Sequence, residues 1–109
     1  MGQNEFEKGQ AFSFADSISY AEKAVVSKHI LKKKTGNISL FAFDQGEELS
    51  EHTTPFDAMV LVVEGKVEIM IDGKSHVLEN GDSIIMPADI PHALKAVEKF
   101  KMVLTMIRS

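Results

Sequence analysis

The chain of 109 residues contains no cysteine and no tryptophan, and only one tyrosine and three prolines. Without cysteine the protein can form no disulfide, bind no metal through a thiolate and use no thiol as a nucleophile. Any metal ion is therefore expected to be held by imidazole and oxygen donors, so the four histidines are the first residues to consider.

Long apolar segments are also missing. The N-terminal residues have no apolar core of signal-peptide length, and no later stretch approaches the roughly 18 apolar residues of a membrane span. Twelve Lys and Arg against sixteen Asp and Glu leave a formal charge of −4, and positive charge clusters only at residues 32–34. This balance argues against a nucleic-acid partner. We therefore expect a water-soluble, cytoplasmic protein with neither a membrane nor a nucleic-acid partner.

What the sequence does contain, from about Lys23 onward, is a series of short apolar runs separated by turn residues. This rhythm is typical of all-β sandwiches and barrels, and no helical pattern competes with it. Eight strands, the number in a jelly-roll barrel, are predicted. They are Ala24–Leu31, Asn37–Asp44, Asp57–Val63, Lys66–Asp72, Lys74–Leu78, Asp82–Met86, His92–Val97 and Phe100–Ile107.

Two segments illustrate how the strands are recognised. Asp72-Gly73 separates two runs and is the strongest β-hairpin signal, since both residue types accept the positive φ of a tight turn. The run 59–63, Met-Val-Leu-Val-Val, is apolar throughout, as expected for a strand covered on both faces. One face of this strand would be covered by the barrel interior. The other could be covered by a further part of this chain or by a partner subunit.

The chain is predicted to form one domain. Residues 23–109 make up a single barrel, and residues 1–22 form an N-terminal arm whose conformation the sequence leaves open. Within the arm, Asp16 or Ser17 could cap a helical turn, or the segment could run extended.

Two spaced motifs carry the chemistry. The first places Gly46, His52 and Gly65 in a segment that ends in the two-sided strand, and the second places Gly81, Pro87 and His92 in the next glycine-led segment. In these spacings the chain resembles the cupin superfamily, in particular its small single-domain members with a conserved barrel. The family's first motif is Gly, five residues, His, one residue, His, three or four residues, Glu, six residues, Gly. Its second is Gly, five residues, Pro, one residue, Gly, two residues, His, three residues, Asn.

The resemblance implies a double-stranded β-helix, or jelly-roll barrel, of the RmlC-like type. It also implies a divalent metal at the barrel mouth on three His and one Glu, and a homodimer. Four motif positions depart from the family, because Thr54 replaces the second His, Ala58 the Glu, Asp89 the Gly of the second motif and Ala96 the final Asn. Two of the four expected ligands are therefore absent.

His52 and His92 remain as the candidate metal ligands, for a divalent transition metal or zinc of unknown identity. The alternative is a pocket without metal in which both imidazoles are neutral and hydrogen-bonded. Asp57 is a poor replacement for the lost Glu, because strand alternation turns it away when Ala58 faces inward. Nothing in the spacing directs the other candidates, His29, Glu68 and His76, at the site.

Further pocket residues are expected beside His52. Thr54, Phe56 and Ala58 would lie at the barrel mouth, with Phe56 either an apolar wall of the pocket or packed in the core. Five methionines are expected to fill the core or pocket, and their spacing shows no ligand pattern that would indicate copper. They are Met59, Met70, Met86, Met102 and Met106.

Three functions remain open at this stage. The first is a metal-dependent enzyme acting on a small oxygenated substrate, and the second is a non-catalytic module or sensor that binds a small molecule without metal. A purely structural domain is the weakest of the three, because two inward histidines in an apolar barrel would incur an avoidable cost.

Overall fold

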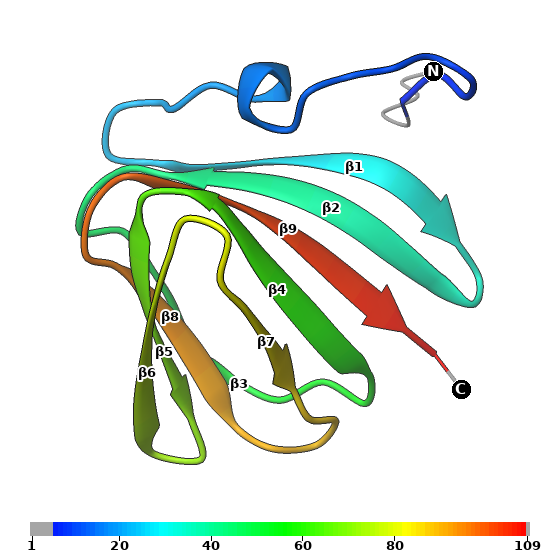
Figure 1. Cartoon of the computed structure of the whole chain (residues 1–109). Helices are drawn as coiled ribbons and strands as arrows, with labels where there is room; N and C mark the ends of the chain where they lie inside the picture. The colour runs from blue at the N-terminus through cyan, green and yellow to red at the C-terminus, as the bar shows by residue number, and fades with distance from the viewer. Residues whose placement is uncertain (1–5, 109) are drawn as a thin grey trace.

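The structure, a computed structural model, describes residues 6–108 and is built almost entirely of antiparallel strands (Figure 1). A single 3-10 turn, η1 (Ala15–Ser17), precedes the strands. The strands are β1 (Val25–Lys33), β2 (Gly36–Phe43), β3 (Glu48–His52), β4 (Asp57–Glu64), β5 (Lys66–Ile71), β6 (Lys74–Glu79), β7 (Ser83–Met86), β8 (His92–Ala96) and β9 (Phe100–Ile107). No helix in this part of the chain is long and apolar enough to cross a membrane.

The strands form two facing sheets. One has five strands in the order β1-β2-β9-β4-β7, and the other has four in the order β3-β8-β5-β6. Figure 1 shows the smaller sheet curled beneath the larger one. This is the predicted jelly-roll architecture, a double-stranded β-helix.

All eight predicted strands are present, with ends displaced by two residues at most. One strand, β3, was not predicted. It is an edge strand with a register shift between Leu49 and His52, and only Leu49 is shielded from solvent along it. A strand that buries so little has no apolar alternation for sequence reasoning to detect.

The main core lies between the sheets, where every second residue of each strand faces inward. Val67 and Ile69 of β5 are fully buried and Ile71 is partly buried, as their alternation predicts. At one end of this core the rings of Phe43 and Phe100 stack with centroids 4.5 Å apart, both fully buried.

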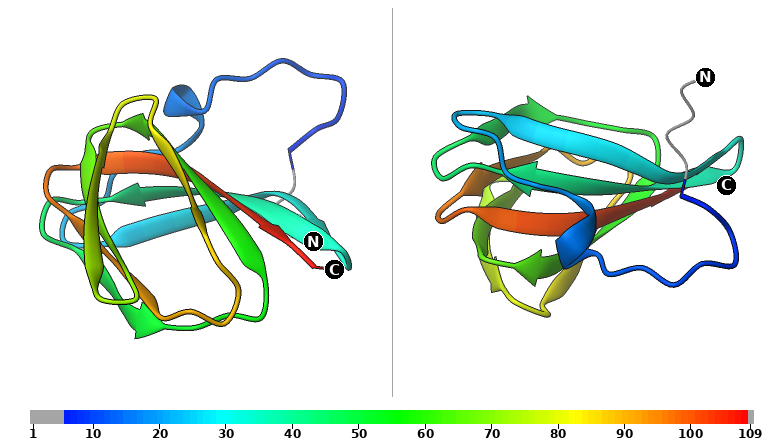
Figure 2. Two further views of the ribbon diagram at one scale, coloured as in Figure 1. Left: turned by 60° about the horizontal axis from the view of Figure 1, so that its bottom comes forward. Right: turned by 90° about the horizontal axis from the view of Figure 1, so that it is seen from above.

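The outer face of the five-stranded sheet is covered by the N-terminal arm (Figure 2). Ile18 of the arm packs with Leu40, Ala42 and Val103 of the sheet, and Phe14 and Tyr20 add to the same cluster. Of the predicted arm, residues 1–22, the first five lie outside the described residues; the rest combines extended chain with one short turn.

The N-terminal arm also covers part of the run 59–63. Leu61 and Val63 pack into the cluster beneath the arm, so the layer over them belongs to this chain. Met59 departs from the prediction, since 42% of it is exposed. The run is therefore covered on both faces only in part, because the arm does not extend over the β4 end where Met59 lies.

Tight turns place residues in the left-handed region where expected. Asp72 and Gly73 have φ of 52° and 79° in the β5–β6 hairpin. Asp89, at the position of the family's second-motif glycine, has φ of 64°. Asp is among the few residues that tolerate this conformation, so the substitution preserves the loop.

Candidate functional site

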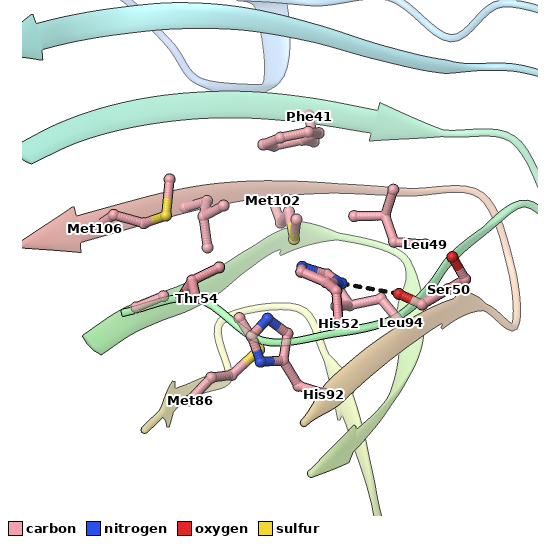
Figure 3. A pocket seen from close by; sticks show the side chains of 12 residues that line it. Phe41, Leu49, Ser50, His52, Thr54, Met86, His92, Leu94, Met102 and Met106 are labelled. Atoms are coloured by element: carbon pink, nitrogen blue, oxygen red, sulfur yellow. Dashed lines mark hydrogen bonds between the residues drawn. The ribbon is translucent and has the colours of Figure 1, made fainter. Parts of the chain in front are cut away.

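A cavity of about 420 Å³ opens between the two sheets (Figure 3). Its polar lining residues are Ser50 and His52 of β3, Thr54 of the following loop and His92 of β8. The rest of the lining is apolar and comes from both sheets: Phe41, Leu49, Ala58, Met86, Leu94, Met102, Leu104 and Met106. The cavity is therefore apolar except where the two histidines lie.

Strand pairing brings the two histidines together. His52 and His92 are directly opposite each other in the antiparallel ladder of β3 and β8. Their ring centroids lie 4.4 Å apart, with the ring planes inclined at 66°. His92 is buried, whereas His52 lies on the exposed edge strand. The pair thus links the cavity interior to its mouth.

Each imidazole is oriented by a backbone carbonyl. The Nδ1–H of His52 donates to the Ser50 carbonyl oxygen at 2.8 Å, and that of His92 to the Ile90 carbonyl oxygen at 3.2 Å. Because a carbonyl can only accept, Nδ1 carries the proton of each neutral ring. The lone pair of each ring is therefore on Nε2, which is the tautomer that a metal ligand or a proton acceptor requires.

Burial lowers the pKa of His92 below its usual value, and the neighbouring His52 adds to this effect. The hydrogen bond to Ile90 acts in the opposite direction; it is weaker than the effect of burial and stronger than that of His52. His92 is consequently neutral at physiological pH, with a lone pair available for binding.

The loop that leads into β8 is fixed at several points. Asp89 N–H donates to the Thr54 carbonyl oxygen at 2.7 Å, and Ala88 N–H donates to Asp57 Oδ1 at 2.9 Å. These bonds join the loop before His92 to the loop after His52. As alternation predicts, Asp57 lies outside the cavity lining while Ala58 is buried within it.

The predicted pocket residues divide into two groups. Thr54 and Ala58 line the cavity, but Phe56 does not. It is half-buried, with the Arg108 guanidinium 4.8 Å from its ring centroid. Neither expectation for Phe56, a cavity wall or a core side chain, describes this position, since the ring is half-buried and lies beside Arg108, which follows β9.

The remaining polar candidates are not part of the cavity lining. His29 Nδ1 lies 3.2 Å from Ser39 Oγ, His76 is opposite Ile69 in the β5–β6 ladder, and Glu68 accepts a hydrogen bond from Ser75. Within residues 6–108 no group of three or more His, Cys, Asp and Glu side chains could hold a metal. Those residues therefore supply only two donors of the usual type.

Sequence reasoning missed part of the cavity wall. Leu49 and Ser50 belong to the unpredicted strand β3, and Phe41 comes from a distant strand. A usable signal existed on β9, where Met102, Leu104 and Met106 occupy every second position and so share one face. Of the other methionines expected in the core or pocket, Met86 lines the cavity and Met70 is only half-buried.

Comparison with known proteins agrees with this architecture. A family model for the cupin domain matches residues 39–108. A conserved protein of unknown function from Streptococcus pyogenes is 33% identical, with 98% of this chain and 93% of that chain covered and a TM-score of 0.91. A cupin 2 conserved barrel domain protein from Leptotrichia buccalis is 36% identical over 89% of this chain and 47% of its own, with a TM-score of 0.86.

One relative carries a biochemical name. "Polyketide synthase CurC" of Streptomyces cyaneus is 33% identical over 72 residues, which is 63% of this chain and 47% of that protein. This chain therefore spans about half the length of that relative. Taken together, the family model, the shared fold and the histidine pair show that the chain belongs to the cupin family.

Proposed function

We propose that the cavity binds a small, mainly apolar, oxygen-bearing molecule, and that His52 and His92 hold a transition-metal or zinc ion at its polar end. One observation carries the proposal. Both Nδ1 atoms are engaged by backbone carbonyls, so two Nε2 lone pairs are available beside an otherwise apolar cavity.

The cavity lining supports this class of ligand. Its volume of about 420 Å³ is within the range of small-molecule sites, and eight of its twelve lining residues are apolar. The polar groups gather near the histidine pair. A ligand with a carbon frame and one carbonyl or hydroxyl group would match this distribution. The name of the Streptomyces relative points to polyketides, which are carbon chains bearing carbonyl groups, as one chemical class to test.

The orientation of the two histidines suits a metal ion, but the number of protein donors is low. Ligating histidines usually donate their second ring N–H to a carbonyl or carboxylate, as both do here. Two imidazoles are one donor fewer than catalytic zinc sites usually have, which leaves positions for water or ligand oxygen. Such an ion would polarise a bound carbonyl oxygen, which is one of the roles of the metal in metal-dependent enzymes.

A second candidate function is metal-free binding. The shortage of donors among residues 6–108 favours it. In this case the neutral imidazoles would accept hydrogen bonds from a ligand hydroxyl, and Thr54 would contribute a hydroxyl of its own.

We further propose a homodimer, as the family resemblance implies. The outer surface beside β7 carries three exposed apolar side chains, with Met59 42%, Ile85 63% and Ile107 63% exposed. They surround a shallow depression at one end of the five-stranded sheet. Exposed apolar patches of this kind are typical of protein contacts. Light scattering should show that the wild type is a dimer and that Ile85→Lys is a monomer. A monomeric wild type would refute the proposal.

The function itself is tested by loading and binding measurements. Untagged protein is equilibrated separately with Mn, Fe, Ni, Cu and Zn, and its metal content is measured alongside His52→Ala, His92→Ala and the control His76→Ala. Acetylacetone and 1-naphthol serve as oxygenated apolar probes in calorimetry. We expect near-stoichiometric metal in the wild type and the control but not in the site variants.

The two candidates give different results in this experiment. Probe binding that requires the loaded ion supports the metal-dependent function. Probe binding without any retained metal, lost in His92→Ala, would replace it by the metal-free function. If neither metal nor probe binds, both functions proposed for the cavity are wrong.

A further inference from the structure

We infer that the ion suited to this cavity is copper(I), bound by His52, His92 and the thioether of Met86, with Met106 and Met102 available beside them. The inference rests on the proposal that the histidine pair holds a metal, and it changes the expected ion from a divalent one. The spacing of the methionines in the sequence shows no copper-ligand pattern, and strand pairing is what gathers their thioethers at the site.

The strand register places two methionines on either side of Ala58. In the five-stranded sheet Ala58 of β4 pairs directly with Met86 of β7 on one side and with Met106 of β9 on the other. Directly opposed residues have Cβ atoms about 4.5–5.5 Å apart and point to the same face. All three line the cavity, so two thioethers flank the small side chain of Ala58.

Ala58 is at a position where the family has a metal ligand. Ala58 stands where the family motif has its ligating Glu, so the carboxylate is replaced by a methyl group between two methionines. Met102, two residues before Leu104 on the same face of β9, adds a third thioether to the cavity wall. Figure 3 shows the three sulfur-bearing side chains and both imidazoles in one cavity.

The donor chemistry of the cavity is soft. Its lining contains two imidazoles, three thioethers and the hydroxyls of Ser50 and Thr54, but no carboxylate. Thioethers are soft donors that suit copper(I), imidazole suits copper as well as zinc, and carboxylates and water suit Mn and Mg. The sequence has no cysteine, so thiolates do not compete for the ion.

Charge leads to the same ion. Of the three ligands, His92 and Met86 are 4% and 3% exposed and His52 lies at the exposed mouth, so an ion between them would be partly removed from water. All of these ligands are neutral, and none offsets the charge of the ion. A buried charge without a countercharge is costly, and the cost rises steeply with its magnitude. A singly charged ion is therefore favoured over a doubly charged one.

Methionine also fills irregular cores without binding any metal, and the test must separate the two roles. Met86→Leu keeps an apolar side chain of similar size and removes only the sulfur. Met59→Leu is the matched control, because Met59 lies on the same strand as Ala58 but 42% of it is exposed on the outer surface.

The experiment is an anaerobic titration of the full chain with copper(I) against the chromophoric chelator bicinchoninate. X-ray absorption of the loaded protein at the copper edge then identifies the donor atoms. We expect one copper(I) per chain, sulfur scattering at the copper, and an affinity at least about tenfold lower in Met86→Leu, on the scale of changes around a metal site. Met59→Leu should bind as the wild type does.

The outcomes separate this inference from the proposed function. Copper(I) binding with only nitrogen donors, or with equal affinity in both Met variants, overturns the thioether site. Stoichiometric binding of a divalent ion with no copper(I) binding also overturns it, but leaves the metal proposal intact. If no ion binds and the probes still do, the metal part of both proposals fails and the metal-free function replaces it.

Discussion

The two faces of the five-stranded sheet are built from the same strands but are completed differently. On the outer face, the N-terminal arm fills the space above Leu40, Ala42 and Val103. On the inner face, the side chains of β9 and β4 leave a cavity of about 420 Å³ against the smaller sheet. The arm fills the space above the outer face where it covers it, whereas the space beside the inner face stays partly open.

The polar groups beneath the arm and those of the cavity also differ, in how many of their hydrogen-bonding atoms are paired. On the outer face Lys101, 8% exposed, donates to the Ala15 carbonyl oxygen at 2.5 Å and lies 3.7 Å from Glu64. Glu64 in turn accepts a hydrogen bond from Tyr20 at 2.6 Å, and burial with this neighbour raises the pKa of the Tyr20 phenol. Across the cavity from the inner face, on the smaller sheet, the two histidines keep ring nitrogens available. Saturated polar groups indicate a structural role, whereas available ones indicate binding.

The largest loss of stability is expected where the Phe43 and Phe100 rings fill the core between the sheets. Phe43→Ala removes a fully buried ring stacked on Phe100 and should lower the free energy of unfolding by about 3–5 kcal/mol in urea denaturation. Phe41→Ala, on the cavity wall, should lower it by clearly less, since Phe41 is only partly buried. Equal losses of stability would mean that the surroundings of Phe41 are as tightly packed as those of Phe43.

A smaller loss is expected beneath the arm. Lys101→Met removes the ammonium that joins the arm to the sheet, and should lower the free energy of unfolding by about 1–3 kcal/mol. Amide exchange in the arm should rise at the same time. Lys99→Met is the control, because Lys99 is exposed and its ammonium lies over the same Tyr20 ring, 5.4 Å from the ring centroid. No difference between the two variants would show that the buried ammonium does not hold the arm.

A matched pair of alanines compares the two faces directly. Ala42→Leu adds bulk to the filled outer cluster and should lower the free energy of unfolding by about 1–3 kcal/mol. Ala58→Leu adds the same bulk beside the cavity, and should change it by less than about 1 kcal/mol while abolishing probe binding. Thermal or urea denaturation and calorimetry measure both effects. Retention of probe binding in Ala58→Leu would place the ligand elsewhere.

The smallest effect is a dependence on pH in the metal-free protein. The pKa of His92 is lower in the folded chain than its usual value of about 6.5. As pH falls through that usual value, the unfolded chain takes up the proton first, so the free energy of unfolding decreases until the folded pKa is passed. His92→Gln should show a shallower decrease than wild type between neutral and mildly acid pH, and His76→Gln the same decrease. A wild-type slope retained in His92→Gln would assign the effect to another group.

The fold could be read from the sequence to a large extent because strands with one buried face alternate visibly. The Asp72-Gly73 hairpin was also predictable, since few residue types accept its backbone angles, and the left-handed Asp89 lies where the family motif has a glycine. Strand β3 was not, because its edge position requires almost no burial. That strand carries His52, so the motif located the residue while the pattern missed the strand that holds it.

The sequence by itself determined the all-β class, the two histidine positions and the loss of the other family ligands, because each depends on local spacing. Only the tertiary structure decided which side chains share the cavity with those histidines. Met86 and Met106 meet on either side of Ala58 through the pairing of three strands that are far apart in the chain. Register between distant strands depends on the packing of the whole sheet, and no local pattern encodes it.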